Sequence, residues 1–294
     1  MTTQGASRPT SLDPDAPSFS IRNDTFEAVF HPAAGGRLGC LRHVRHGDLI
    51  VPFTPVGFDP SAWPKSGAFP LFPFHNKLRQ ATFDHNGRQV HLRPNMSDGS
   101  GVMHGPAHRR AWIVTNHEEN QITLALEYRA DADWPFDFCA TQRFELHQDR
   151  LTVTLRLTNT GHEIMPGGLG WHPYFRASVD GVIGIEAAQR WSPFGPTGLV
   201  QDGPVPPRAR LKTGLTLHYS GWTQATAVIG DGARIRLTGT GALTCFAALH
   251  KEEYLCLEPV SHVAGALELP QRETGVRHLA PGESLQGSAI LSVI

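Results

Sequence analysis

Hydrophobic and polar residues alternate along much of the chain. Between residues 151 and 158, every odd position is Leu or Val and every even position is Thr or Arg. A period of two puts successive side chains on opposite faces of a β-strand. The run Thr141–Leu146 is predicted to pair with this strand across a turn at Gln148 and Asp149. The pattern predicts further strands at Phe19–Phe30, Ile122–Tyr128, Ala225–Ile229, Arg234–Leu237, Ala242–Leu249 and Ser284–Ser292.

Helical periodicity is scarce, and 30 Gly and 23 Pro are spread between the hydrophobic runs. These residues interrupt strands and favour turns, so many short antiparallel strands are expected. The chain has no composition shift and no repeat of fixed period. We therefore predict an all-β fold, a single large antiparallel β-sandwich over residues 19–294. Residues 1–18 are rich in Ser, Thr, Pro and Gly and are predicted to be a disordered tail, without the pattern of a secretory signal.

Charge and cysteine content narrow the class of protein. With a net charge of −1 and a pI near 7.0, the chain lacks the excess of basic residues expected of a protein that binds nucleic acid or an anionic membrane. No apolar run approaches the roughly 20 residues of a membrane span. The four cysteines form no CxxC pair, which favours free thiols in a reducing, cytoplasmic compartment. P-loop, GxGxxG, HExxH and GxSxG motifs are absent from the sequence, so nucleotide-dependent and zinc-peptidase chemistry is not expected.

Four stretches carry candidate chemistry. His75, Asn76 and Lys77 follow a run rich in Pro and Phe, which would hold their polar ends in fixed positions. His104 precedes a glycine, and His172 follows the glycine-rich sequence 167–170. The alternative interpretation is that the triplet belongs to a buried irregular loop and that the two histidines, among 16, are hydrogen-bonded core residues.

Glu258 is the fourth candidate, at the end of an apolar run and directly before a proline. A carboxylate in such a place is desolvated unless it is paired, and desolvation raises its pKa toward the range of a general base. The alternative is a strand-end carboxylate in a salt bridge with an arginine.

In this order, the four stretches resemble the aldose 1-epimerases (mutarotases). That family shows an aromatic-rich segment ending in Asn-Arg-Ile, then Leu-His-Gly, then a His-Pro-Tyr-Phe-like motif, and late in the chain Glu-Pro. The matching segments here are 76–78 (Asn-Lys-Leu), 103–105 (Met-His-Gly), 172–175 (His-Pro-Tyr-Phe) and 258–259 (Glu-Pro), with Trp112 and the Ser-Gly-Trp of 220–222 as further matches. The resemblance covers roughly residues 19–293.

The resemblance implies a β-supersandwich that binds a free sugar and interconverts its α and β anomers. Ring opening needs a base at the C1 hydroxyl and an acid at the ring oxygen. By resemblance Glu258 is the base, His172 the acid and His104 the partner near the ring oxygen. Asn76 and Lys77 match residues that bind sugar hydroxyls, and Trp222 belongs to the same substrate-binding set. The resemblance implies no metal and no cofactor, and a monomer or homodimer.

Two departures concern specificity. The family's arginine is Lys77 here, which loses the planar, bidentate fork. The aspartate that many members use to hold sugar hydroxyls falls on Thr216, counted back from Trp222. A hydroxyl is a weaker acceptor than a carboxylate, so weak saturation by galactose and glucose is expected.

Three other functions stay open from the sequence. An epimerase of a modified sugar, such as a hexose phosphate, would need cleft-facing cations, for which Arg79, Arg109 and Arg110 are candidates. A non-catalytic sugar-binding domain is the second alternative, because a fold does not fix an activity. A metal site made of His104, His172 and Glu258 is the third, although these residues share no local ligand spacing.

Overall fold

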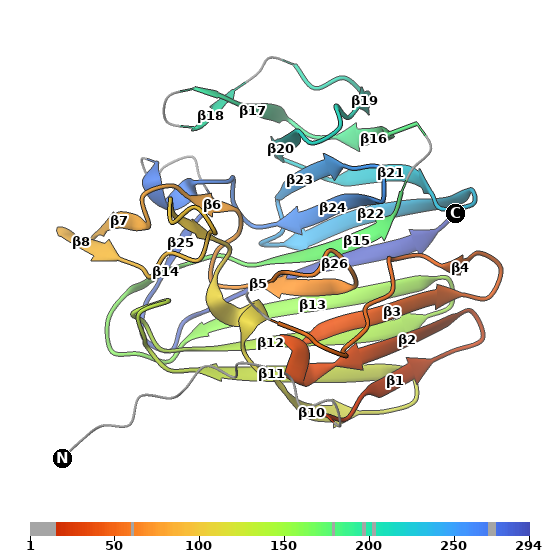
Figure 1. Cartoon of the computed structure of the whole chain (residues 1–294), viewed down its shortest axis with the longest axis horizontal. Coiled ribbons are helices and arrows are strands. Elements are labelled where there is room, and N and C mark those ends of the chain that lie inside the picture. Colours follow the sequence, from red (N-terminus) through yellow and green to blue (C-terminus); the bar gives the residue numbers. More distant parts are fainter. Residues whose placement is uncertain (1–15, 60–61, 178–179, 196–197, 202–203, 270–274) are drawn as a thin grey trace.

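The computed structural model describes residues 16–59, 62–177, 180–195, 198–201, 204–269 and 275–294. Two large sheets dominate it, and the strand pairs are antiparallel (Figure 1). The first sheet runs, in spatial order, through β1 (Phe19–Arg22), β2 (Phe26–His31), β3 (Arg37–His43), β5 (Ala68–Leu71), β15 (Gly170–Arg176), β24 (Tyr254–Val260), β23 (Cys245–His250), β20 (Thr216–Ser220), β17 (Gln189–Gly195) and β18 (Gly198–Gln201), with β4 (Gly47–Asp48) beside β3.

The second sheet is built mostly from long neighbouring hairpins. Its spatial order is β10 (Ile113–His117), β11 (Gln121–Tyr128), β12 (Phe138–His147), β13 (Arg150–Asn159), β26 (Ser284–Val293), β22 (Ala233–Gly241), β21 (Gln224–Ile229), β16 (Val182–Glu186) and β19 (Arg208–Arg210). The final strand, β26, lies between β13 and β22 and so joins two halves of the sheet that are far apart in sequence.

Short elements gather at one end of the sandwich, at the left of Figure 1. They are the two-stranded pairs β6 (Lys77–Leu78) with β9 (Val102–Met103), β7 (Thr82–His85) with β8 (Arg88–His91), and β14 (Met165–Gly167) with β25 (Arg277–Leu279). Three 3₁₀ helices in the described residues are η1 (Pro32–Ala34), η2 (Pro106–Arg109) and η3 (Ala266–Glu268). No helix in the described ranges is long and apolar enough to cross a membrane.

The predicted all-β fold and the central hairpin are confirmed. β12 and β13 pair over their full lengths across the expected turn, and Gln148 has a positive φ of 48°. The single strand predicted over Phe19–Phe30 is wrong: it is the hairpin β1–β2. The Asn23 side-chain oxygen accepts the backbone N–H groups of Thr25 and Phe26 and so holds its turn.

The strand predicted over Ala242–Leu249 begins later than expected. β22 continues to Gly241, and β23 begins at Cys245 after a tight connection. The reason is a turn in which the N–H of Leu243 donates to the carbonyl of Thr240 and that of Thr244 to the carbonyl of Ala242. The apolar run 242–249 includes this turn, so hydrophobicity alone does not show where β22 ends and β23 begins.

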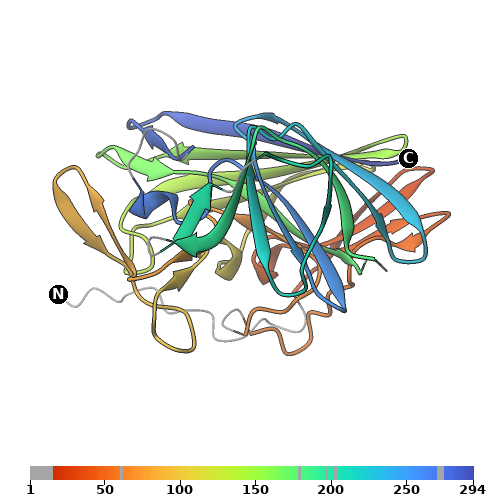
Figure 2. The same cartoon turned by 90° about the horizontal axis from the view of Figure 1, so that it is seen from above.

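Two separate hydrophobic clusters lie on opposite sides of the first sheet. The larger one fills the space between the two sheets, whose layers are seen edge-on in Figure 2. The smaller one is made of outward-facing residues of the first sheet and the segments above them, including Phe69, Tyr174, Cys256 and Val260. The central strands are therefore buried on both faces, which explains why β24 reads as a continuous apolar run instead of an alternating one.

The division of the chain remains our proposal. The expected tail, 1–18, falls mostly outside the described residues, and β1 begins at Phe19. The larger cluster includes residues from Ile21 to Leu291, which supports one domain over 19–294.

Candidate active site

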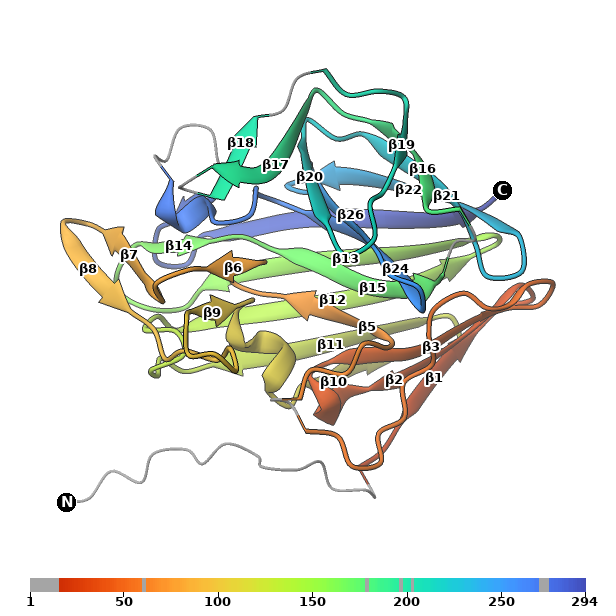
Figure 3. The same cartoon turned by 45° about the horizontal axis from the view of Figure 1, so that its top comes forward.

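A row of side chains crosses the outer face of the first sheet. His172 on β15 is the register partner of Phe69 on β5. Between β15 and β24, Gly170 pairs with Val260 and Tyr174 with Cys256. This register sets His172 opposite Glu258. Glu258 in turn faces Ala247 on β23. Opposed residues in a sheet project to the same face. The row crosses six neighbouring strands and reads Phe69, His172, Glu258, Ala247, His218 and Trp191. Figure 3 shows strands that carry it, among them β5, β15, β24 and β20.

Glu258 is a buried carboxyl group, with only 3% of its surface exposed. Burial raises its pKa to about 8. Within the described part of the chain it pairs with no arginine, its Oε2 atom has no hydrogen-bond partner, and His172 is the basic side chain beside its Oε1. The structure therefore favours a desolvated carboxyl group over a strand end in a salt bridge with an arginine.

His172 packs against two aromatic rings. The ring of Phe69 stacks with its imidazole at 4.6 Å between ring centroids, and the ring of Tyr174 at 4.7 Å. Its Nε2 lies 3.5 Å from Oε1 of Glu258. Burial is the main cause that lowers the pKa of His172 well below its usual value, with the charges of Lys65 and Arg37 adding to it. Burial thus favours a carboxylic acid beside a neutral imidazole.

His104 is fixed by a reciprocal backbone pair with Asn76. The N–H of Asn76 donates to Nδ1 of His104 at 2.9 Å, and the N–H of His104 donates to the carbonyl of Asn76 at 3.0 Å. Because an amide N–H only donates, Nδ1 holds the lone pair and Nε2 carries the hydrogen. Burial, then the neighbouring His172, lowers the pKa of His104 well below its usual value. Its ring lies edge-on to His172 at 5.4 Å, so a neutral N–H donor stands beside the His172–Glu258 pair.

The backbone around His104 explains the Met-His-Gly sequence. Any side chain at Gly105 would place its Cβ 2.0 Å from the carbonyl oxygen of Phe72, so glycine is required. The side chain of Asn95 makes two hydrogen bonds to Met103, accepting from its N–H at 2.7 Å and donating to its carbonyl at 3.0 Å. This contact secures the short strand β9, after which His104 follows directly.

Asn76, Lys77 and Thr216, three residues of the proposed substrate-binding set, have different surroundings. The Oδ1 atom of Asn76 accepts the N–H of Lys77. The ammonium of Lys77 donates to Ser100 Oγ at 3.2 Å. Thr216 is half-buried and projects to the same face as Glu258, one row along, where it is opposed by Leu249.

Trp222 does not lie on this face. It is 3% exposed and stacks on Phe246 at 4.7 Å. Phe246 opposes Pro259, next to Glu258 in sequence and therefore on the inner face of the sheet. A Cβ added at Gly239 of the second sheet would meet the Trp222 ring at 2.3 Å. Trp222 is thus a core residue between the sheets, and we remove it from the proposed substrate-binding set.

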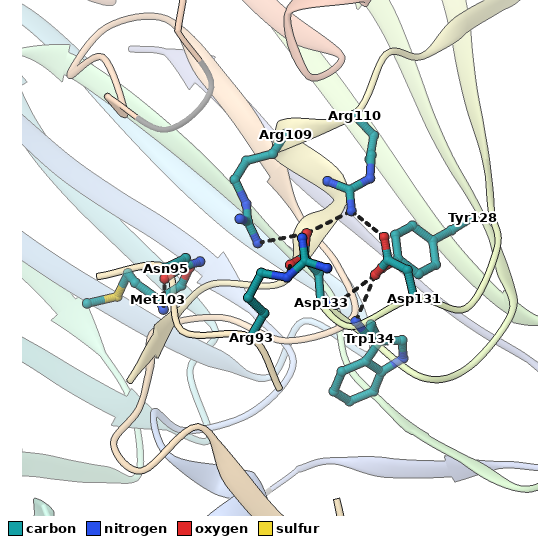
Figure 4. A network of polar contacts seen from close by, with 9 residues as sticks. All are labelled: Arg93, Asn95, Met103, Arg109, Arg110, Tyr128, Asp131, Asp133 and Trp134. Carbon is teal, nitrogen blue, oxygen red and sulfur yellow. Dashed lines mark hydrogen bonds and ion pairs between the residues drawn. The ribbon is translucent and has the colours of Figure 1, made fainter. Parts of the chain in front are cut away.

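Two of the arginines considered for a phosphate group are engaged elsewhere. Arg110 donates to Asp133 at 2.8 Å and to Asp131 at 2.7 Å, and Arg109 lies 3.9 Å from Asp133 (Figure 4). Asp133 is buried, and Arg93 is a third cation beside it at 3.8 Å. This network joins η2 to the connection after β11. It occupies Arg109 and Arg110 in a structural role.

The described residues hold one candidate metal-ligand group, made of His172, Cys256 and Glu258. One ligand atom from each lies within 4.8 Å of the others. It differs from the expected set, because Cys256 takes the place of His104. Burial, and then the charge of Glu258, raise the pKa of the Cys256 thiol well above its usual value, which disfavours the thiolate that a metal needs.

Two residues near the site, His218 and Arg37, were not singled out from the sequence. Buried His218 lies in the same row as Glu258, and its ring centroid lies 6.0 Å from that of His75, the buried first residue of the candidate triplet. Arg37 places its guanidinium 4.8 Å from the Phe69 ring that stacks on His172. Cross-strand register brings His218 into the row, and no local motif marks it. Among 16 histidines, composition could not separate it from the rest.

Comparison with known proteins identifies the family of the chain. The family model described as aldose 1-epimerase matches residues 18–292, and the chain belongs to that family. A curated relative, the uncharacterized protein YphB of Escherichia coli K12, is 29% identical over 251 residues, covering 78% of this chain and 84% of the relative.

Solved structures share the fold over nearly the whole chain. The crystal structure of a proposed aldose 1-epimerase of Escherichia coli K12 has a TM-score of 0.82 and 25% identity, covering 95% of this chain and 99% of its own. A galactose mutarotase-like protein of Clostridium acetobutylicum has a TM-score of 0.81 at 16% identity, covering 94% and 95%. The latter likeness concerns the fold alone. Membership of this family supports an isomerase that acts on a sugar.

Proposed function

We propose that the protein is a mutarotase that interconverts the α and β anomers of a free sugar. Glu258 removes the proton of the C1 hydroxyl, and His172 protonates the ring oxygen, so that the C1–ring oxygen bond breaks and an open-chain aldehyde forms. Rotation about C1–C2 and reclosure on the other face give the second anomer and return both protons. His104, through its Nε2–H, donates a hydrogen bond near the ring oxygen.

The observation that carries this proposal is the 3.5 Å contact between His172 Nε2 and Glu258 Oε1. The hydroxyl that loses a proton and the ring oxygen that gains one are both bonded to C1. The base and the acid must therefore be neighbours, as these two side chains are. Binding alone would not require such a pair.

Burial of the pair favours the reaction in a specific way. The form active in ring opening is a carboxylate beside an imidazolium, which has the same number of protons as a carboxylic acid beside a neutral imidazole. Ring opening converts the first arrangement into the second. Desolvation disfavours separated charges. Burial therefore stabilises the carboxylic acid and the neutral imidazole that are present after ring opening.

A polarimetric screen of freshly dissolved sugars tests the proposal. The wild type should accelerate mutarotation of at least one aldose, and His172→Asn should lower that rate about 10²-fold. The control variant is Glu163→Gln, which alters an exposed carboxylate paired with Arg88 away from the row and should leave the rate unchanged. Acceleration that survives His172→Asn would refute the role of His172, and a wild type inactive on all aldoses would refute the function.

A further inference from the structure

His75 and His218 form a second pair of imidazoles that the ring-opening steps leave unused. Both side chains are buried, at 1% and 4% exposure, and their ring centroids lie 6.0 Å apart. His75 directly precedes Asn76, whose backbone N–H donates to His104, so it belongs to the same part of the site. In the row across the sheet, Ala247 lies between Glu258 and His218.

The hydrogen bonding of His75 fixes which nitrogen is free. Its Nε2 lies 2.7 Å from the carbonyl oxygen of His262, and a carbonyl only accepts, so Nε2 carries the hydrogen. The backbone N–H of His75 also donates to Nε2 of His262 at 3.3 Å, which fixes the loop position. Burial lowers the pKa of His75 to about 4, so the ring is neutral at pH 7. Its Nδ1 is therefore a bare acceptor, buried and without a partner among the described residues.

His218 is positioned by the sheet itself. It opposes Ala247, which opposes Glu258, so two strand spacings, about 10 Å, separate the backbones of His218 and Glu258. Ala247, the smallest side chain of the row, lies between the two and is itself buried. Burial, and then His75, lower the pKa of His218 to about 3, and its Nδ1 has no hydrogen-bond partner in the described part of the chain.

Buried polar atoms without a hydrogen-bond partner destabilise a fold unless a ligand satisfies them. We propose that His75 and His218 are a hydroxyl-binding subsite, which takes two hydroxyl groups of an uncharged sugar at a distance from C1. This inference rests on the proposed function, because Glu258 and His172 fix where C1 lies. A carboxylate at position 216 would accept hydrogen bonds from sugar hydroxyls, and Thr216, in the next row, is a weaker acceptor. The subsite would supply these hydrogen bonds instead.

The subsite also limits the class of substrate. Two neutral imidazoles offer hydrogen bonds and no charge, so a phosphate or carboxylate placed against them would lose its hydration without gaining a cation. The sugar end that meets His75 and His218 should therefore carry free hydroxyl groups.

The test is calorimetric binding of galactose, glucose and their singly deoxygenated derivatives to the full-length protein. For the sugar that binds, loss of the contacted hydroxyl should weaken binding to the wild type about tenfold. His218→Phe keeps a planar ring but removes both nitrogens. In this variant the parent sugar should bind about tenfold more weakly, and parent and deoxy sugar should bind equally.

Two further variants keep the test decisive. His85→Phe makes the same change at a buried histidine of β7 outside the row and should leave the deoxy-sugar effect intact. His218→Asn, a smaller polar replacement, should recover part of the binding and serves if His218→Phe does not fold. Wild-type binding by His218→Phe, or equal weakening for parent and deoxy sugars together, would overturn the subsite. A deoxy-sugar effect that depends on His218 without any mutarotation would support the subsite and refute the proposed function instead.

Discussion

His104 and Asn76 hold each other through two hydrogen bonds, one from each backbone N–H, and this contact settles the tautomer of the imidazole. Both residues adopt a positive φ, 56° for His104 and 62° for Asn76. Such backbone conformations are uncommon for residues other than glycine, and the paired hydrogen bonds compensate for them. The Nε2–H of His104 is therefore preset as a donor before any sugar arrives.

The first prediction concerns this donor. In His104→Asn the side-chain oxygen can still accept the N–H of Asn76, but nothing replaces the hydrogen on Nε2. We expect kcat to fall roughly 10²-fold while thermal unfolding stays close to that of the wild type. Polarimetry and circular dichroism measure the two quantities. A normal kcat in the folded variant would show that His104 does not assist the ring oxygen.

The second prediction concerns Glu258→Gln. The amide keeps the shape but cannot take a proton, so kcat should fall roughly 10²-fold or more with sugar binding largely preserved. The variant should also gain stability relative to the wild type as the pH rises from 5 to 9. The folded protein holds the carboxyl proton up to a pKa of about 8, whereas the unfolded chain releases it near the ordinary value, so wild-type stability falls with pH across that window.

Melting temperatures of both proteins at several pH values check the stability part. The difference should widen toward pH 8 and then level off. A difference that stays constant from pH 5 to 9 would show that the buried carboxyl group is not protonated in the fold.

The third prediction is the pH dependence of catalysis. Glu258 and His172 act with one shared proton, so kcat/KM should follow the singly protonated pair and decline above a pH of about 8. Loss of that proton leaves the base but removes the acid. A rate that rises through pH 8 would instead mean that Glu258 acts with a neutral imidazole, which only donates a hydrogen bond.

The fourth prediction concerns stability in acid. Burial lowers the pKa of His75 to about 4 and that of His218 to about 3, so the unfolded chain binds more protons than the fold between these values and 6.5. The stability that these two groups contribute is therefore full above pH 6.5 and is lost as the pH falls toward 3–4, by about 3 kcal/mol for His75 alone. Because Glu258 acts in the opposite direction over part of this range, the measurement is a comparison of two proteins: in denaturant titrations at pH 7 and pH 5, the free energy of unfolding of His218→Phe relative to that of the wild type should rise as the pH falls. An equal change in both proteins would contradict the assignment.

The fifth prediction is independence from metal ions. Dialysis against a chelator should leave mutarotation unchanged, since both protons are moved by protein side chains. The informative control is Cys256→Ser, which removes one member of the group formed with His172 and Glu258. Activity that is lost on dialysis, restored by one divalent ion, and no longer restored in Cys256→Ser would establish a metal site.

The features that can be predicted best from the sequence are those with a local signal. Alternation predicts β13 and its hairpin with β12. Features formed where strands far apart in the chain meet are predicted least well. The position of His218 depends on the registers of β20 with β23 and of β23 with β24, which no short pattern encodes. Trp222 was assigned to the site from its place in a motif, but it packs on Phe246 in the core between the sheets. Closeness to a motif in sequence does not determine the direction in which a side chain points.

The doubly buried strand β24 separates two kinds of mutational effect. Its inward positions, Leu257 and Pro259, face the space between the sheets, whereas Cys256, Glu258 and Val260 project to the outer face. Substitutions at the inward positions should change stability and leave substrate choice alone. Substitutions along the outer rows, such as Ala247 and Thr216, should change which sugars bind while the sandwich stays intact. A library for altered sugar preference could therefore begin with the outward residues Thr216, His218 and Ala247 of β20 and β23.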